Sequence, residues 1–265
     1  PNGACFNYVD QNICELEPLS MACLKCNCDA RNYPQKLWRC IRQVKQNSVI
    51  RHNDNLNYIF ISSYQEKQLR RRVPEIKHRY LVKNPINVGV RVQIEAEKNS
   101  DFVYIGRLSG EKGPQLFCEA VTKAGVHGVV IGKGILEETL KSKYPNIEFA
   151  GWQGKEKINE YLKKTRALIF PTLWYEGSPL TVPEVQAHGI PCIVTDCSSA
   201  IDDIVQGKNG EVVETDVDKM AAAINRFKND EYVRELSRNT YQMFDEKRGS
   251  EKWYVENLMK IYLER

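Results

Sequence analysis

The sequence predicts an α/β fold built on a parallel, doubly wound sheet that carries helices on both faces. From about residue 100 onward, short apolar runs typical of buried strands alternate with longer amphipathic stretches typical of helices. Strands and helices of this size form βαβ units, whose right-handed crossovers place each loop that follows a strand at the same sheet edge. A hydrophobic content of 42% is enough to fill the core of such a fold.

The elements after residue 100 alternate regularly. The expected strands are 102–105, 128–131, 147–150, 167–170, 192–194 and 210–213. The expected helices are 114–123, 135–143, 155–165, one that starts at Ser178, 218–229, 231–244 and one near the chain end. We therefore expect the loops at 106–113, 132–134, 152–154, 171–180 and 195–201 to converge.

The first part of the chain gives weaker signals. Residues 31–49 predict an amphipathic helix that packs on a sheet through Leu37, Trp38, Ile41 and Val44. A strand at 57–63 that ends in a helix cap, a basic helix at 65–72 and a strand at 80–87 follow. The run Arg70-Arg71-Arg72 fits contact with anionic lipid headgroups or an anionic acceptor, and also a solvated helix face.

Charge and hydropathy exclude two classes of protein. The formal net charge of +4 is too small to indicate nucleic-acid binding, and no apolar run has the roughly 18 residues of a membrane-spanning helix. The chain starts at Pro1-Asn2-Gly3 without an initiating Met and without a signal peptide. We therefore expect a trimmed or partial chain.

The nine cysteines are unevenly placed. Cys118, Cys192 and Cys197 lie on or beside apolar segments and are expected to be small buried side chains. The other six crowd the first 40 residues: Cys5, Cys14, Cys23, Cys26, Cys28 and Cys40. This group fits a structural zinc site built on Cys23-x2-Cys26, free thiols or, in an oxidising compartment, disulfides.

The stretch from Trp174 to Glu184 lies between two predicted strands and must form a loop that opens into a helix. Gly177 permits a tight turn, and Ser178 followed by Pro179 fits a helix cap and a first helical residue. A helix that starts at the carboxyl end of a parallel strand offers free backbone N–H groups to an anion, usually a phosphate. Two carboxylates, Glu176 and Glu184, bracket this stretch with seven residues between them.

Two motifs resemble those of a known family. The pair Glu176-x7-Glu184, followed by Gly189-x-Pro191, resembles the signature of retaining, nucleotide-sugar-dependent glycosyltransferases of family 4. The upstream stretch Gly106-Arg107-Leu108-Ser109-Gly110-Glu111-Lys112-Gly113 matches the basic loop of that family. The resemblance implies the GT-B fold, in which two Rossmann-like domains face each other across a cleft.

The resemblance also implies roles for the charged residues. Arg107 and Lys112 match the residues that bind the donor diphosphate, where a guanidinium fork and a mobile ammonium would stabilise the leaving group. The alternative is a surface Arg and a Lys paired with Glu111. Glu176 matches the first Glu of the signature, near the transferred sugar, and is assigned binding or charge stabilisation. Lys133 is a weaker third cation.

Glu184 has two interpretations. The resemblance implies that it accepts hydrogen bonds from a ribose diol. Alternatively, Thr181-Val182-Pro183-Glu184 fits a capping box, in which Glu184 is only a structural cap.

The resemblance also places substrate contacts, made mainly through the backbone, at Gly106, Gly177, Ser178, Pro179 and Leu180. Trp152 or Gln153 would border the nucleobase, unless Trp152 is a core residue.

The resemblance implies three parts: 1–86 as the remnant of an N-terminal acceptor-side domain, 87–248 as a complete nucleotide-sugar-binding Rossmann-like domain, and 249–265 as a helix that crosses back. One departure from the family concerns the acceptor side. The Gly-rich loop of that domain is not evident before residue 50, and no His occupies the place of the family's His near the reacting carbon. We therefore expect nucleotide binding, while catalysis by this chain alone is an open question.

The expected function is transfer of a sugar from a nucleoside diphosphate to a glycan or lipid-linked acceptor. No cofactor or metal is expected besides the donor substrate, and no nucleic acid. The resemblance implies a cytoplasmic setting, in surface-polysaccharide assembly with peripheral contact to the inner membrane face. Two alternatives are a non-catalytic nucleotide-binding fragment and a GT-B nucleotide-sugar epimerase. A dinucleotide-dependent oxidoreductase is disfavoured, because Gly106-x6-Gly113 lacks the Gly-x-Gly-x2-Gly spacing.

Overall fold

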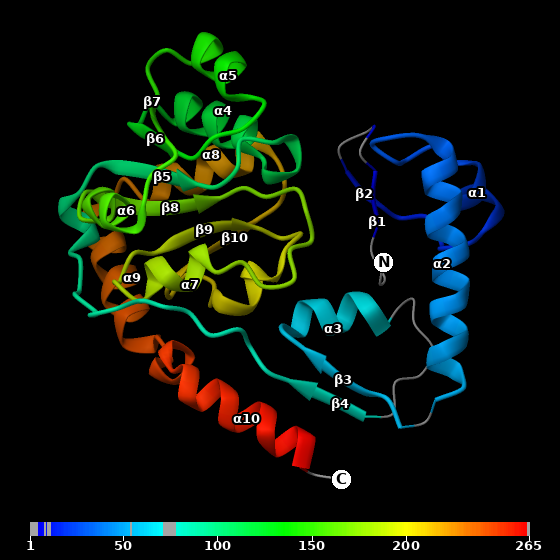
Figure 1. Ribbon diagram of the computed structural model, residues 1–265. Helices are drawn as coiled ribbons and strands as arrows, with labels where there is room; N and C mark the ends of the chain where they lie inside the picture. The colour runs from blue at the N-terminus through cyan, green and yellow to red at the C-terminus, as the bar shows by residue number, and fades with distance from the viewer. Residues whose placement is uncertain (1–4, 8, 10–11, 54, 71–77, 264–265) are drawn as a thin grey trace.

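The computed structural model describes residues 5–7, 9, 12–53, 55–70 and 78–263. Its largest element is a six-stranded sheet in the order β10-β9-β8-β5-β6-β7 (Figure 1). All neighbouring strands in this sheet are parallel. The predicted α/β class with a parallel, doubly wound sheet is confirmed.

The strands of this sheet lie close to their predicted positions. They are β5 (Asp101–Ile105), β6 (Gly128–Ile131), β7 (Glu148–Gly151), β8 (Thr165–Phe170), β9 (Cys192–Thr195) and β10 (Gly210–Val213). The helices between and after them are α4 (Pro114–Ala124), α5 (Glu137–Lys143), α6 (Lys155–Leu162), α7 (Thr181–Gln186), α8 (Val217–Arg226), α9 (Asp230–Met243) and α10 (Glu251–Leu263). Short 3-10 turns complete the domain: η1 (Ala96–Lys98), η2 (Gly110–Lys112), η3 (Ser199–Asp203) and η4 (Glu246–Gly249).

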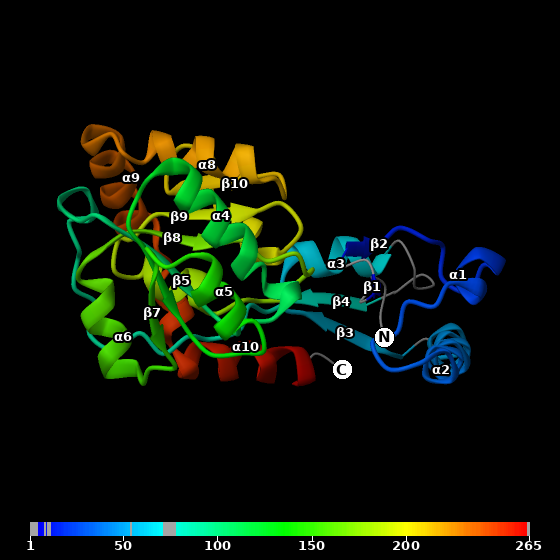
Figure 2. The same ribbon diagram turned by 90° about the horizontal axis from the view of Figure 1, so that it is seen from above.

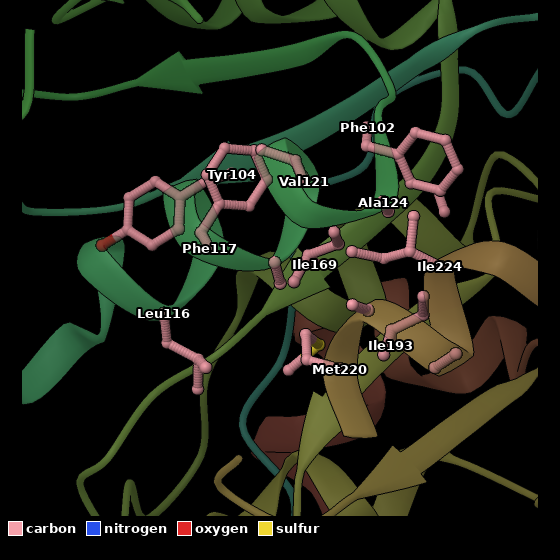
Figure 3. Close-up of a cluster of buried hydrophobic side chains, with 14 of the residues drawn as sticks. Phe102, Tyr104, Leu116, Phe117, Val121, Ala124, Ile169, Ile193, Met220 and Ile224 are labelled. Atoms are coloured by element: carbon pink, nitrogen blue, oxygen red, sulfur yellow. The ribbon is translucent and has the colours of Figure 1, made fainter. Parts of the chain in front are cut away.

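Successive side chains of each central strand point to opposite faces of the sheet, and each face has its own core. On one face, Phe102, Tyr104 and Ile169 pack with side chains of α4 and α8 (Figure 3). On the other face, Leu168 and Phe170 pack with side chains of α6 and α7. Burying both faces explains why these strands read as continuous apolar runs.

The part of the chain before residue 82 lies to one side of this sheet (Figures 1 and 2). Its strands form two small sheets: β1 (Cys5–Asn7) pairs antiparallel with β2 (Asn12–Cys14), and β3 (Asn57–Phe60) pairs parallel with β4 (His78–Leu81). Its helices are α1 (Met21–Lys25), α2 (Tyr33–Arg51) and α3 (Ser63–Arg70). The helix at 65–72 is thus shifted toward the N-terminus, and Arg71 and Arg72 lie outside the described residues. The strand expected at 80–87 is shorter than predicted.

The environment predicted for α2 is wrong. Trp38, Ile41 and Val44 are 61%, 61% and 56% exposed, so this apolar face does not pack on a sheet. Of the predicted apolar face only Leu37 is half-buried, and the one buried residue of the helix is Lys36, whose Nζ lies 2.8 Å from the Leu24 carbonyl oxygen. Figure 1 shows α2 at the end of the molecule farthest from the six-stranded sheet.

Residues 82–95 run from β4 back to the six-stranded sheet and are fixed by an ionic cluster. Asp203 in η3, with a side chain only 7% exposed, accepts from Lys83 Nζ at 2.9 Å and from an Arg248 guanidinium nitrogen at 2.6 Å.

The last helix, α10, extends toward β3 and β4, as Figures 1 and 2 show. None of the helices in the described ranges combines the length and hydropathy that a membrane crossing requires.

Candidate functional site

The carboxyl ends of β5 and β8 form the switch point of the sheet. From β5 the chain continues to β6 and β7 on one side, and from β8 to β9 and β10 on the other. The chain connections after β5 and β8 therefore run to opposite sides of the sheet, and such a switch point is the usual ligand site of open α/β sheets. These two loops carry both sequence motifs, at 106–113 and 174–184.

The loops at this edge touch one another through glycines, as the predicted convergence requires. A Cβ atom built on Gly113 would lie 1.9 Å from the Pro171 carbonyl oxygen, and one on Gly132 would lie 1.9 Å from the Gly106 oxygen. Gly113 and Gly132 also have φ angles of +67° and +150°. Only glycine fits both the conformation and the space at these positions.

The structure brings Lys112 and Glu176 together. Lys112 Nζ donates to Glu176 Oε1 at 2.7 Å, and their side chains are 21% and 15% exposed. The Thr172 hydroxyl lies 3.2 Å from Glu176 Oε1 and 3.1 Å from the Glu111 carbonyl oxygen. Backbone pairing adds to this connection, because Leu173 N donates to the same Glu111 oxygen at 2.9 Å. The β5 and β8 loops thus form one unit.

Arg107 lies at the rim of this unit. Its guanidinium is 3.3 Å from Glu111 Oε1, and its side chain is 74% exposed. The alternative interpretation, a surface Arg and a Lys paired with Glu111, therefore applies to the position of Arg107 but not to Lys112. Glu111 is further oriented by the Ser109 hydroxyl, which donates to the same carboxylate oxygen at 2.8 Å.

The β8–α7 loop differs from the prediction at Ser178. Helix α7 begins at Thr181, so Ser178 is not its cap, and Leu180 occupies that position without a side-chain capping bond. Proline at position 183 explains the late start, because it belongs in the first turn of a helix. Among the described residues, Ser178 Oγ is a buried oxygen without a hydrogen-bond partner. Pro179 is buried and Leu180 is 40% exposed.

The capping-box interpretation of Glu184 is wrong. Thr181 is the first helical residue and not the cap, so the two side chains do not form the reciprocal bonds of that motif. Glu184 is half-buried, and burial raises the pKa of its carboxyl group, while Lys155 acts in the opposite direction. The contacts that join Lys112, Glu176 and Thr172 do not include Glu184.

Trp152 lies after β7, an edge strand of the sheet. The interpretation as a core residue is wrong, because Trp152 is 71% exposed. The neighbouring Gln153 donates through Nε2 to the Ala150 carbonyl oxygen at 2.5 Å. The third cation, Lys133, adjoins this strand end, since a Cβ atom on Gly151 would meet Lys133 Cε at 3.6 Å. In the described part of the chain, no hydrogen bond or ion pair joins Trp152 or Lys133 to the Lys112–Glu176 pair.

Thr172 is not among the predicted site residues, yet it is 1% exposed and lies between Glu111 and Glu176. Thr172 lies two residues after the end of a predicted strand, but threonine has no spacing signature that marks this role. For the cysteines, burial of Cys118 and Cys192 is confirmed, whereas Cys197 is half-buried. No group of three or more His, Cys, Asp or Glu residues in the described ranges is arranged to hold a metal ion. The side chain of Cys5 lies outside the described residues.

Comparison with known families decides what this site belongs to. Residues 99–230, which include both loops of the switch point, match the family described as glycosyl transferases group 1. This region is a group 1 glycosyl transferase domain. This confirms the resemblance that the basic loop and the paired Glu residues predicted.

Two curated bacterial proteins are similar to this chain. The UDP-Gal:alpha-D-GlcNAc-diphosphoundecaprenol alpha-1,3-galactosyltransferase of Escherichia coli is 29% identical over 172 residues, covering 58% of this chain and 44% of that protein. The lipopolysaccharide 1,6-galactosyltransferase of Salmonella typhimurium is 29% identical over 185 residues, covering 64% and 51%. The chain thus spans about half the length of these relatives.

The fold is also that of solved glycosyltransferase structures. Sucrose-phosphate synthase from Thermosynechococcus elongatus superposes with a TM-score of 0.72 at 19% identity, covering 84% of this chain and 61% of that one. At this identity the likeness concerns the fold alone. It confirms the predicted GT-B type.

Proposed function

We propose that this chain carries the donor-binding part of a retaining glycosyltransferase, which transfers a hexose from a nucleoside diphosphate sugar to a glycan or lipid-linked acceptor. The observation that carries this proposal is the switch-point cluster of Lys112, Glu176 and Thr172, with Arg107 at its rim. Two cations and a carboxylate at the carboxyl edge of a parallel sheet fit a diphosphate bonded to a polar sugar.

Sugar transfer requires above all that the departing nucleoside diphosphate be stabilised. The bond between the anomeric carbon and the diphosphate oxygen breaks, and the electron pair leaves with the nucleoside diphosphate. A new bond forms between the anomeric carbon and an acceptor oxygen, which loses its proton. Arg107 and Lys112 would stabilise the negative charge that develops on the leaving oxygen. Glu176 would bind the sugar or stabilise the positive charge at the anomeric carbon.

Other residues support smaller parts of the proposal. The unpartnered Ser178 Oγ fits a hydrogen bond to a phosphate or sugar oxygen, because a buried polar atom otherwise lacks compensation for its lost hydration. Glu184 would accept from the ribose diol. Gly106, Gly177, Pro179 and Leu180 would contact the donor mainly through their backbone, and the exposed Trp152 would border the base. No cofactor is proposed besides the donor substrate.

The three-part division at residues 86 and 248 stays a proposal. The folded unit from η1 to α9 is consistent with a Rossmann-like donor domain, and the small sheets before residue 82 with part of an acceptor-side domain. The names of the two relatives support a lipid-linked or lipopolysaccharide acceptor and UDP-galactose as the donor to test first. A cytoplasmic role in surface-polysaccharide synthesis is proposed on the same basis.

Peripheral membrane contact is the remaining part of the proposal, and α2 offers the best surface for it. The outward face of this helix presents Trp38, Ile41 and Val44. Between Tyr33 and Arg51 the helix contains five Lys or Arg residues and no Asp or Glu. Lys36 is buried and Arg39 pairs with Asp29 at 2.9 Å, which leaves Arg42, Lys45 and Arg51 for a membrane surface. Exposed apolar side chains on a basic helix suit the interface of an anionic membrane.

The test is turnover of a nucleotide-sugar panel. The protein is incubated with UDP-galactose, UDP-glucose, UDP-N-acetylglucosamine and GDP-mannose, with and without a lipid-linked N-acetylglucosamine acceptor. Release of nucleoside diphosphate together with a glycosylated acceptor supports the transferase. Conversion of the sugar without release indicates an epimerase, and nucleotide binding without turnover indicates a non-catalytic binding domain. Absence of both binding and turnover contradicts the proposal.

A further inference from the structure

The backbone of the β8–α7 loop is supported from the side of β9. The Ser199 backbone N–H donates to the Glu176 carbonyl oxygen at 3.1 Å, so η3 holds the residue that carries the candidate carboxylate. Immediately before η3, Cys197 Sγ lies 2.8 Å from the Thr172 carbonyl oxygen. The segment from Cys197 to Asp203 therefore fixes both ends of the stretch from Thr172 to Glu176.

This supporting segment is itself held by the distant part of the chain. The Tyr64 hydroxyl donates to the Cys197 carbonyl oxygen at 2.7 Å, and the Tyr64 backbone N–H donates to Asp202 Oδ2 at 3.0 Å. Both bonds join residues more than 130 positions apart, and Tyr64 is 8% exposed. Although Asp202 belongs to η3, its carboxylate lies beside the first turn of α3, where the helix dipole favours a negative charge.

The start of α3 also contacts the loop directly. A Cβ atom on Gly177 would meet Ile61 Cδ1 at 3.4 Å and Gln65 Nε2 at 3.5 Å, which are ordinary van der Waals distances. Gln65 is oriented by two local bonds: its Oε1 accepts from Ile61 N at 3.2 Å, and its backbone N donates to Ser62 Oγ at 3.0 Å. α3 thus touches the residue next to Glu176 and also anchors the segment that supports Glu176.

We propose that Tyr64 is a positioning residue for Glu176, acting through Cys197, Asp202 and the start of η3. Lys112 and Arg107 come from the β5 loop, whereas the two bonds of Tyr64 described above lead to Cys197 and Asp202, so we expect the diphosphate to bind without help from the Tyr64 hydroxyl. The geometry of the carboxylate relative to the anomeric carbon would depend on it. Misplacement by a fraction of an ångström lowers the rate of the chemical step more than it lowers donor affinity. The inference rests on the proposed function, because it assigns Glu176 to the reacting sugar.

The experiment compares Tyr64→Phe, which removes only the hydroxyl, with Tyr58→Phe on the neighbouring strand β3 as a matched control. For Tyr64→Phe we expect kcat to fall about tenfold, the equivalent of about 1.4 kcal/mol, with the Kd for UDP close to the wild-type value. Hydrogen exchange of the amides at 174–180 and 197–203 should become faster. Tyr58→Phe should leave kcat, the Kd for UDP and the exchange rates unchanged.

A second variant and the exchange measurement distinguish failure of the Tyr64 inference from failure of the proposed function. Asp202→Asn weakens the other anchor and serves if Tyr64→Phe does not fold. Unchanged exchange at 174–180 in both variants overturns the inference, and so does faster exchange with unchanged kcat. A wild-type protein that neither binds UDP nor turns over a nucleotide sugar refutes the proposed function instead. In that case the exchange data still decide whether Tyr64 orders the loop.

Discussion

Lys112 Nζ lies 2.7 Å from Glu176 Oε1, so a cation from the β5 loop is paired with a carboxylate from the β8 loop. The pair spans the switch point of the sheet, where the two loops diverge. A diphosphate that binds there must compete with Glu176 for Lys112 or share it. We therefore expect the affinity for a nucleoside diphosphate to depend on the presence of the Glu176 carboxylate, whereas a shift of this carboxylate by a fraction of an ångström affects mainly the chemical step.

Removal of either cation should weaken donor binding. We expect Arg107→Ala and Lys112→Ala each to raise the Kd for UDP or GDP by about 10- to 100-fold, since a hydrogen bond to a charged group contributes roughly 1.5–3 kcal/mol. The increase in Kd should be smaller for Arg107→Ala than for Lys112→Ala, because Arg107 is the more exposed of the two. Isothermal titration calorimetry measures the effect. Lys123→Ala, which removes a surface ion pair with Asp218, is the control, and unchanged Kd values for both site variants would contradict the diphosphate assignment.

The Lys112–Glu176 pair should also contribute to stability. A double-mutant cycle with Lys112→Ala and Glu176→Gln should give a coupling energy of about 1 kcal/mol in urea unfolding, because both side chains are partly shielded from water. Lys112→Ala alone should be more destabilising than the double variant, since it leaves a half-buried carboxylate without its partner. Strictly additive effects would show that the pair has no energetic significance.

Glu184→Gln should weaken nucleoside binding without lowering the melting temperature. Burial raises the pKa of Glu184 above its ordinary value of 4.5, so the folded protein binds more protons than the unfolded chain in the pH range just above 4.5. The free energy of unfolding therefore falls as pH rises through this range, and the Gln variant should lack this part of the pH dependence. Thermal unfolding between pH 4 and 7, with UDP titration at pH 7, measures both effects. A clear drop in melting temperature at pH 7 would point back to a structural role.

Gly113→Ala should destabilise the protein far more than Gly125→Ala. Both glycines have positive φ angles, +67° and +64°, so both variants carry a strain of about 1 kcal/mol. Only Gly113 has a neighbour in the way, because a Cβ atom would lie 1.9 Å from the Pro171 oxygen, whereas nothing lies within 4 Å at Gly125. Gly113→Ala should also weaken UDP binding. Equal melting temperatures of the two variants would mean that the loops do not depend on this close approach.

The exposed face of α2 should bind anionic membranes. We expect the protein to sediment with vesicles rich in phosphatidylglycerol and not with phosphatidylcholine alone, since anionic headgroups attract each nearby Lys or Arg by about 1 kcal/mol. A Trp38→Glu, Ile41→Glu double variant should lose this binding. Val255→Glu on α10, another exposed apolar position, should retain it. Equal binding to the two vesicle types, or none, would refute a membrane role for α2.

Local patterns were sufficient to predict the six-stranded sheet. Apolar runs such as Gly128–Ile131 and Ala167–Phe170 are buried on both faces, so hydrophobicity alone marked them as strands. The basic loop and the paired Glu residues could be assigned to the sheet edge, because all parallel βα loops share one edge. Strand order depends on long-range pairing, and the switch point between β5 and β8 was therefore not predictable from periodicity.

The errors have specific physical causes. Ser178-Pro179 has the composition of a helix start, but Pro183 fits the first turn equally well and the later start occurs. The apolar stripe of α2 predicted burial, yet it faces outward, since periodicity shows that a helix is amphipathic but not which neighbour it meets. Thr172 and Tyr64 act through contacts across 61 and 133 positions of sequence, which no local pattern records.

Gly113 approaches Pro171, and Gly132 approaches Gly106, so closely that these loops meet main chain against main chain. An insertion in any one of these loops would separate the others, so we expect insertions to be tolerated only in segments farther from the strand ends. Redesign of nucleobase preference should therefore begin with outward-facing side chains such as Trp152 and leave the spacing of the glycines intact.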